Sequence, residues 1–199
     1  MTKQTFYGAA LPKLEAAERQ LVSLCTQCPL SHELDGESPS VLSCISRIKS
    51  PDSMIAKLRG RGLAADCQAA LTAVHDAVGV RVICAFADDV YRVAGWLAAQ
   101  PDLRCIQVKD YIACPKPNGY RSYHMIVELA GGPGQGITAE IQLRTIAIDF
   151  WATLEHQMKY KRTIPHEALI RAELKRCADE IASVDLSMQT IRELLTQSF

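Results

Sequence analysis

The stretch VGVRVICAF, residues 78–86, decides the fold class, because it is an almost continuous run of β-branched and apolar residues. Such a run is typical of a strand buried inside a sheet. Further strands are predicted over residues 103–109, 123–129 and 137–143, and a helix is predicted over residues 88–99. The sequence therefore predicts an α+β fold in which a central β-sheet is flanked by helices.

Helices are predicted at both ends of the chain. Over residues 10–29, apolar side chains recur at steps of three and four, which is the spacing of one helix face. Over residues 165–197 the same steps produce a longer seam, which consists of Ile170, Leu174, Cys177, Ile181, Val184, Met188, Ile191 and Leu195. This seam has two compatible explanations: packing against the N-terminal helix, or an interface between subunits.

Shorter segments complete the pattern. Ser50 is a favourable N-cap and Pro51 a favourable first helical residue, so residues 52–58 are predicted to be helical. Helices are also expected over residues 63–75 and 146–160. The polar residues 31–40 are expected to form a loop.

The composition argues against several classes of protein. The 199 residues carry 22 basic and 22 acidic side chains, whereas a bulk nucleic-acid binder would carry a basic excess. No apolar run approaches the ~18 residues of a membrane-spanning helix. Residues 1–20 contain no apolar segment typical of a secretory signal, so the eight cysteines are expected to be reduced thiols in the cytoplasm. Cys25 and Cys28 form a CxxC motif with no second pair, which favours core packing over a zinc site.

Two carboxylates are candidates for a metal site. Within EIQLR, residues 140–144, polar and apolar residues alternate, so Glu140, Gln142 and Arg144 share one face of the strand. Asp76 shortly precedes the strand at residues 78–86, and it converges with Glu140 if the two strands are neighbours. Such a pair suits Mg²⁺, which binds one or two carboxylates together with substrate phosphates.

Two basic segments are candidates for nucleotide binding. Residues 47–61 carry five basic side chains and one acidic one, which resembles a polyphosphate cradle, with a solvated surface as the alternative. Residues 109–124 contain two prolines and an Asn-Gly pair, so they are predicted to form a stiff loop with a turn. Tyr120 at its tip offers a flat face to a base.

Five motifs stand in an order that resembles a known family. They are SRIKSPDS at residues 46–53, DAVGVRVI at 76–83, KDYIACPKPNGYRSYH at 109–124, EIQLRT at 140–145 and DFWATLEH at 149–156. Together they resemble the synthetase domain of the RelA/SpoT homologue superfamily, and specifically the small alarmone synthetases of the RelQ type. The resemblance covers residues 41–162. It implies a nucleotidyltransferase-like mixed β-sheet flanked by helices, in a single synthetase domain over residues 1–199.

The resemblance also implies a reaction and a set of residue roles. Members transfer the β,γ-pyrophosphate of ATP to the 3′-hydroxyl of GTP or GDP and release AMP. The implied cofactor is Mg²⁺, bound by Asp76 and Glu140, and Glu140 is assigned as the catalytic base. The implied ATP-binding residues are Arg47, Lys49, Ser53, Lys57 and Arg81, of which the two arginines stack on adenine. The implied GTP- or GDP-binding residues are Lys109, Lys116, Asn118, Tyr120, Arg121, His124 and Gln142, with Tyr120 stacking on guanine.

Assembly and regulation follow from the same resemblance. A homotetramer joined through the terminal helices is expected, together with an alarmone effector or single-stranded RNA as a partner. Residues 41–45 lack the aromatic residue of an allosteric alarmone site, so activation by pppGpp is not expected. Gln107 replaces an Arg of many long relatives, so their GDP-versus-GTP preference does not transfer. No His-Asp metal motif precedes the synthetase region, so hydrolase activity is not expected.

Two other functions stay open. A toxic-type relative would pyrophosphorylate tRNA 3′ ends or adenine nucleotides, although the segment after Pro165 carries more acidic than basic residues. A catalytically inactive relative would bind nucleotides or RNA as a regulator, although Asp76, Glu140 and Tyr120 are all present.

Overall fold

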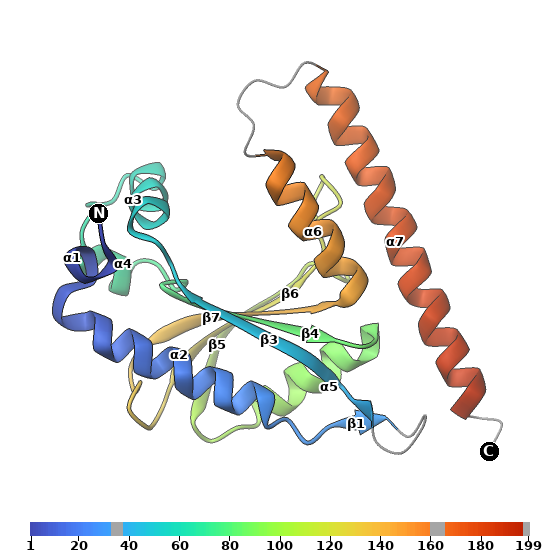
Figure 1. Cartoon of the computed structure of the whole chain (residues 1–199), viewed down its shortest axis with the longest axis horizontal. Coiled ribbons are helices and arrows are strands. Elements are labelled where there is room, and N and C mark those ends of the chain that lie inside the picture. The colour runs from blue at the N-terminus through green and yellow to red at the C-terminus, as the bar shows by residue number, and fades with distance from the viewer. Residues whose placement is uncertain (33–37, 160–165, 197–199) are drawn as a thin grey trace.

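The computed structural model describes residues 1–32, 38–159 and 166–196 (Figure 1). Its main sheet has five strands in the order β3-β4-β7-β6-β5. Strands β4 and β7 are parallel, and the other neighbours are antiparallel, so the sheet is mixed, as expected. The strands are β3 (Val41–Ile48), β4 (Val78–Cys84), β5 (Leu103–Asp110), β6 (Tyr123–Leu129) and β7 (Thr138–Thr145). Two short strands, β1 (Ser31–His32) and β2 (Ser38–Pro39), pair with each other in the segment expected to be a loop.

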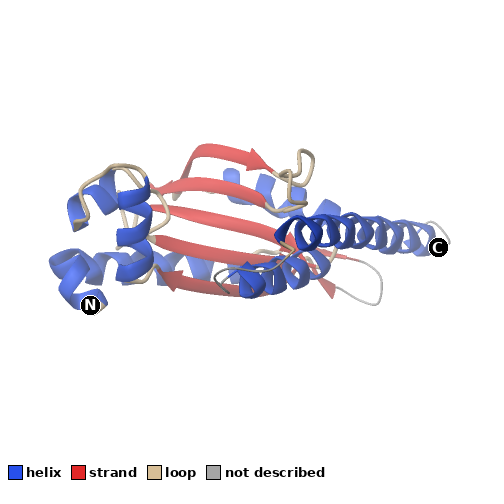
Figure 2. Cartoon of the chain, turned by 90° about the horizontal axis from the view of Figure 1, so that it is seen from above, coloured by secondary structure: helices blue, strands red, loops and turns tan. Residues whose placement is uncertain are grey.

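Helices cover both faces of this sheet. In Figure 1, α2 and α5 lie on one side, and α6 lies on the other with α7 beside it. Figure 2 shows the strands side by side, with α7 extending past the sheet. The helices are α1 (Lys3–Tyr7), the 3-10 turn η1 (Gly8–Ala10), α2 (Leu11–Thr26), α3 (Pro51–Gly60), α4 (Cys67–Thr72), α5 (Ala87–Ala98), α6 (Ile146–Lys159) and α7 (Glu167–Thr196).

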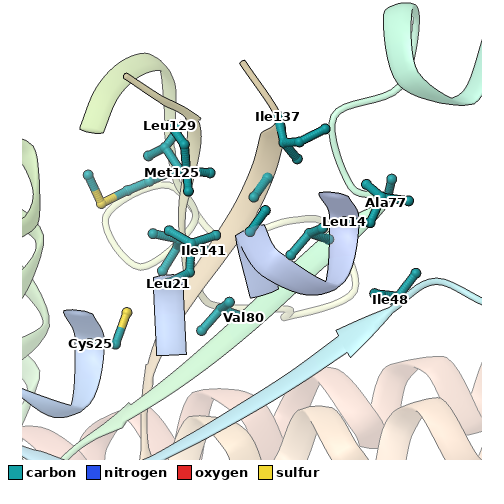
Figure 3. Packing of buried hydrophobic residues seen from close by; sticks show 14 of the residues in the cluster. Leu14, Leu21, Cys25, Ile48, Ala77, Val80, Met125, Leu129, Ile137 and Ile141 are labelled. Carbon is teal, nitrogen blue, oxygen red and sulfur yellow. The ribbon is translucent and has the colours of Figure 1, made fainter. Parts of the chain in front are cut away.

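The main core lies between α2 and the sheet. Leu14, Leu21 and Cys25 of α2 are fully buried, and they face Val80 of β4 and Ile141 of β7 (Figure 3). The three- and four-residue spacing in the sequence therefore brings one helix face onto the sheet. Cys25 belongs to this core, which confirms the packing interpretation of the CxxC motif for that residue.

Two elements differ from the prediction. The helix expected over residues 63–75 is only Cys67–Thr72, because the Asp66 side chain accepts a hydrogen bond from the Ala69 N–H and sets a later start. Strand β3 is not among the strands predicted from the sequence. It is an edge strand with many exposed side chains, so its sequence lacks the apolar pattern of a buried strand.

The C-terminal apolar seam does not pack against the N-terminal helix, but against α6 and the start of α5. The first half of α7 packs against α6 through Leu174, Cys177 and Ile181, around Trp151. Its second half contacts the start of α5, where Arg192 forms an ion pair with Asp88. Helix α2 lies on the opposite face of the sheet (Figure 1), so packing of the seam against the N-terminal helix was wrong. The seam residues Val184, Met188, Ile191 and Leu195 are each at least half exposed.

No helix in the described part of the chain is long and apolar enough to cross a membrane.

Candidate functional site

The candidate site occupies the sheet face that α2 and α5 leave open, which we call the polar face. Strand register brings residues of both predicted nucleotide sites into adjacent rows across it. Arg47 of β3 lies opposite Gly79 of β4, which lies opposite Glu140 of β7. In the next row, Arg81 lies opposite Gln142, which lies opposite His124 of β6, and Lys109 of β5 follows. The parallel pairing of β4 and β7 therefore confirms that the strand that Asp76 precedes and the strand that carries Glu140 are neighbours.

Asp76 lies between two lysines. Its Oδ2 accepts hydrogen bonds from Lys49 Nζ at 2.7 Å and from Lys57 Nζ at 2.5 Å. Burial by itself would raise the pKa of Asp76, but the two ammonium groups outweigh it and hold that pKa below its ordinary value. The other oxygen, Oδ1, is buried and has no hydrogen-bond partner.

Glu140 is held by two neighbours on the polar face. Its Oε1 lies 3.0 Å from His124 Nδ1, and its Oε2 accepts from Gln142 Nε2 at 2.7 Å. Burial would raise its pKa, but the hydrogen bond and charge of His124, the bond from Gln142 and the charge of Lys57 lower it to about 2. The charge of Lys57 therefore lowers the pKa of both carboxylates.

These carboxylates fit a divalent metal. Asp76 has one buried oxygen without a partner, which is costly unless a cation or donor reaches it. No cluster of three or more metal-binding side chains occurs among the residues that the structure describes. Mg²⁺ needs few protein ligands, because it keeps several waters and binds substrate phosphates. Asp76 and Glu140 therefore match the donor set of a metal that arrives with a nucleotide.

Arg47 and Arg81 lie on the neighbouring strands β3 and β4. Their positions are offset by one step along the same face, because Arg47 lies opposite Gly79 and not opposite Arg81. Gly79 has no side chain. A Cβ built there would lie 3.9 Å from Arg47 Cγ, so the Arg47 side chain lies next to Gly79. Arg81 Nη1 bonds Asp149 Oδ1 at 3.1 Å, while its Nε is buried without a partner. Burial and the nearby charge of Arg144 lower the pKa of Arg81, and Asp149 opposes that effect. The offset leaves two guanidinium planes that can face one flat ligand.

Helix α3 contributes the basic side chains beyond β3. Ser50 caps the helix by accepting from the Ser53 N–H, as predicted, and Pro51 occupies its first position. Ser53 therefore lies in the first turn, at the positive end of the helix dipole, which favours an anion. Lys57 follows one turn later, on the same helix face, and reaches Asp76.

Residues 116–121, which we call the acceptor loop, carry Tyr120 at the edge of the polar face. Lys116 Nζ lies 4.4 Å from the centroid of the Tyr111 ring and 4.8 Å from that of Tyr120. Asn118 donates to Glu155 of α6 at 3.2 Å and accepts from the Tyr120 N–H. Asn118 thus shapes the loop and ties it to α6.

The structure turns one predicted residue toward α7. Arg121 Nη2 bonds Asp179 at 3.0 Å, and its Nη1 donates to the Ala178 carbonyl at 3.2 Å. This arrangement does not bring Arg121 together with the lysines around Asp76. Binding of a phosphate by Arg121 stays a prediction.

Three residues of the site had no role assigned from the sequence. They are Arg144, which donates to Tyr120 and Gln142, Asp149, which bonds both Arg81 and Arg144, and Glu155, which accepts from Asn118. The alternation of residues 140–144 placed Arg144 on the polar face. Only the packing of α6 on the sheet reveals the other two, because Asp149 and Glu155 lie on that helix.

Comparisons with known proteins agree with this geometry. Residues 46–164 match the family described as the region found in RelA and SpoT proteins. The GTP pyrophosphokinase YwaC of Bacillus subtilis is 42% identical over 151 residues, which cover 74% of this chain and 72% of YwaC. The GTP pyrophosphokinase YjbM of the same organism is 32% identical over 188 residues, which cover 92% and 86% of the two chains. The small alarmone synthetase 1 of Bacillus subtilis, solved with its product pppGpp, is structurally similar, with a TM-score of 0.81, 30% identity, and coverage of 94% and 96%.

Proposed function

Because the chain belongs to the family of proteins that share the RelA/SpoT region, we propose that it is a (p)ppGpp synthetase working through the polar face. It transfers the β,γ-pyrophosphate of ATP to the 3′-hydroxyl of GTP or GDP and releases AMP. The observation that carries the proposal is the placement of Asp76, just before β4, and Glu140, on the neighbouring strand β7, with lysines bonded to Asp76 and with Tyr120 bonded to His124 beside Glu140.

The basic side chains prepare the site for phosphates. ATP brings a polyanion, and Lys49 and Lys57 supply positive charge from β3 and α3. In the free protein Asp76 bonds both lysines and balances only one of their two charges, so phosphates compete with it for their ammonium groups. Mg²⁺, when bound by Asp76 and Glu140, supplies positive charge that neutralises the phosphates further. Arg47 and Arg81 hold the adenine, and Ser53 and Lys57 hold phosphates.

Glu140 accepts the proton of the acceptor hydroxyl. The 3′-oxygen forms a bond to the β-phosphorus of ATP, the bond from that phosphorus to the bridging oxygen breaks, and AMP leaves with this oxygen. In the free protein both Glu140 oxygens are hydrogen-bonded and its pKa is about 2, so it is ionised at neutral pH. The hydroxyl has to replace one of these hydrogen bonds before it can donate its proton. Positioning of the two nucleotides supplies much of the acceleration.

Substitution of Glu140 tests the assignment of the base. Glu140→Gln keeps the size of the side chain and removes the proton acceptor, so synthesis falls by about 10²- to 10⁴-fold. Binding of ATP should persist, because Asp76 and the lysines are unchanged. Transfer of label from ATP to GTP measures synthesis, and calorimetry with a non-hydrolysable ATP analogue measures binding.

A matched control is Glu128→Gln. Glu128 lies on β6, on the same face of the sheet as Glu140, and forms an ion pair with the exposed Arg104. This variant should keep wild-type synthesis. Near-normal turnover of Glu140→Gln would show that the base is another group.

Parallel acceptors test the reaction class. Labelled ATP is incubated with GTP, GDP, GMP, an adenine nucleotide or tRNA, and the proposal requires label in the guanosine nucleotides. Label in tRNA or adenine nucleotides alone would support the toxic-type alternative, and no transfer to any acceptor would support the inactive regulator.

Assembly and location complete the proposal. The chain forms one synthetase domain over residues 1–199, with a catalytic core over about 41–162, and it acts in the cytoplasm, where ATP and GTP are available. We propose a homotetramer joined through the terminal helices, supported by the exposed apolar residues of α7. An alarmone effector and single-stranded RNA remain candidate partners, although residues 41–45 lack the aromatic residue that activation by pppGpp would use.

A further inference from the structure

Arg144 is a buried cation on β7, and its side chain shares the polar face with Glu140 and Gln142. Its side chain is 5% exposed, and a guanidinium at such a position is costly unless its donors are paired. Its Nη1 bonds Asp149 at 2.9 Å. Its Nη2 donates to the Tyr120 hydroxyl at 2.9 Å and to Gln142 Oε1 at 3.0 Å. Its Nε lies 3.4 Å from Ser122 Oγ.

These bonds belong to a closed ring of five side chains. Arg144 contacts Tyr120, whose hydroxyl lies 2.9 Å from His124 Nε2. His124 Nδ1 lies 3.0 Å from Glu140, which accepts from Gln142, and Gln142 returns to Arg144. The ring therefore joins the stacking residue proposed for guanine to the carboxylate proposed as the base.

Arg144 determines the direction of the hydrogen bonds in this ring. A guanidinium can only donate, so the Tyr120 oxygen accepts from Arg144, which leaves the Tyr120 proton to be donated to His124 Nε2. A neutral imidazole that accepts at Nε2 carries its hydrogen on Nδ1, and this hydrogen is donated to Glu140. The amide of Gln142 is oriented in the same way, because its oxygen accepts from Arg144 and its nitrogen donates to Glu140.

Asp149 connects this ring to the ATP side. Its Oδ1 bonds Arg144 at 2.9 Å and Arg81 at 3.1 Å. One carboxylate oxygen on α6 therefore holds a guanidinium from β7 and another from β4.

We propose that Arg144 and Asp149 form a positioning pair, which orients Tyr120, Gln142 and Arg81 so that both nucleotides are held in mutual register. The proposal rests on the proposed function for the identity of these nucleotides. A purely structural brace between β7 and α6 would predict a different result, because it would lower stability and leave the affinity of the folded protein for each nucleotide unchanged.

Two conservative variants separate these explanations. Arg144→Lys keeps the charge but loses the fork that holds Asp149 through Nη1 and Tyr120 and Gln142 through Nη2, so KM and Kd for GTP should rise about 10- to 100-fold while those for ATP stay near wild type. Asp149→Asn keeps an acceptor oxygen and loses the charge shared by Arg81 and Arg144, so the constants for both nucleotides should rise about tenfold or more. In both variants kcat at saturation should fall less than kcat/KM.

The controls address folding and the proposed function separately. Arg104→Lys changes an exposed arginine paired with Glu128 and should leave every constant unchanged. Thermal unfolding of each variant reports loss of fold, and calorimetry with GTP and a non-hydrolysable ATP analogue gives Kd even if turnover is absent. An inactive wild type that binds both nucleotides would overturn the proposed function alone, and the Kd values would still decide the role of the pair.

Nuclear magnetic resonance tests the ring without any reaction. In nucleotide-free protein at pH 8, the ¹⁵N shifts of His124 should report the Nδ1–H tautomer. In Arg144→Met, Tyr120 no longer has to donate to His124, and the tautomers should mix. The inference is overturned if His124 is mainly Nε2–H in the wild type, or if both conservative variants keep wild-type Kd values for both nucleotides.

Discussion

At the scale of single residues, the site consists of carboxylates whose charge is balanced before any ligand arrives. Lys49 and Lys57 share one oxygen of Asp76, and His124 and Gln142 occupy the two oxygens of Glu140. These contacts stabilise the ionised forms, so they oppose the cost of burying charge. The same contacts have to loosen when phosphates and the acceptor hydroxyl bind.

The acid sensitivity of the fold follows from these residues. The pKa of Glu140 is about 2 in the folded protein, below its value of 4.5 in an ordinary setting, and that of Asp76 is also lowered. A lowered carboxylate pKa contributes stability that is present above the unfolded value and lost as pH falls toward the folded value. The free energy of unfolding should therefore drop between about pH 5 and pH 2.

In Glu140→Gln this drop should be smaller by about 2–3 kcal/mol, because the amide does not titrate. Urea unfolding of both proteins across this pH range measures the difference. An equal pH dependence would contradict the assigned contacts of Glu140.

At the scale of elements, the acceptor loop is shaped by α7 as well as by its own sequence. Gly119 has a φ of +85°, and a Cβ built there would lie 2.7 Å from Ala178 Cβ and 3.3 Å from Lys175 Cα. Arg121 anchors the same loop to Asp179. The conformation of Tyr120 thus depends on a helix that lies far along the chain.

Gly119→Ala should disturb this contact. The left-handed backbone costs about 1 kcal/mol for alanine, and the overlap with Ala178 adds about 1–3 kcal/mol or displaces the loop. KM for GTP should rise and the free energy of unfolding should fall, as measured by steady-state kinetics and urea unfolding.

Gly136→Ala is the matched control, because Gly136 has a φ of +80° and only Lys13 Nζ within 4.0 Å. It should show the backbone cost without a change in KM. Equal effects of the two variants would mean that contact with α7 does not determine the loop.

At the scale of the whole molecule, α7 leaves an apolar surface uncovered in the single chain. Val184, Met188, Ile191 and Leu195 of the seam are each at least half exposed. Such a surface on a long helix usually meets another chain. Its position beyond the sheet (Figure 2) leaves the polar face free for nucleotides.

Light scattering should therefore report a tetramer of the 199-residue chain. The double variant Val184→Glu, Ile191→Glu should reduce its mass, because charges would be buried in the contact. Ile106→Glu, at an exposed apolar position on the edge strand β5, should keep the tetramer. A monomeric wild type would overturn the assembly.

The sequence alone predicted most of the elements and the residues that meet on the polar face. Strict alternation over residues 140–144 and the buried run over 78–84 are local signals, since side-chain direction in a strand depends only on the period of two. Strand β3 was not predicted, because an edge strand need not bury an apolar face. The motif order indicated Asp76, Glu140 and Tyr120 before any geometry was known.

Only the tertiary structure decided how these residues are connected. The parallel pairing of β4 and β7 brings Gly79 beside Glu140, and α6 places Asp149 between Arg81 and Arg144. The heptad pattern shows an apolar seam on α7 but does not show its partner. It therefore did not predict that α7 packs on α6 instead of α2. Periodicity reports the direction of each side chain relative to its own backbone, whereas the partner of a buried charge depends on residues that the fold brings together from distant parts of the chain.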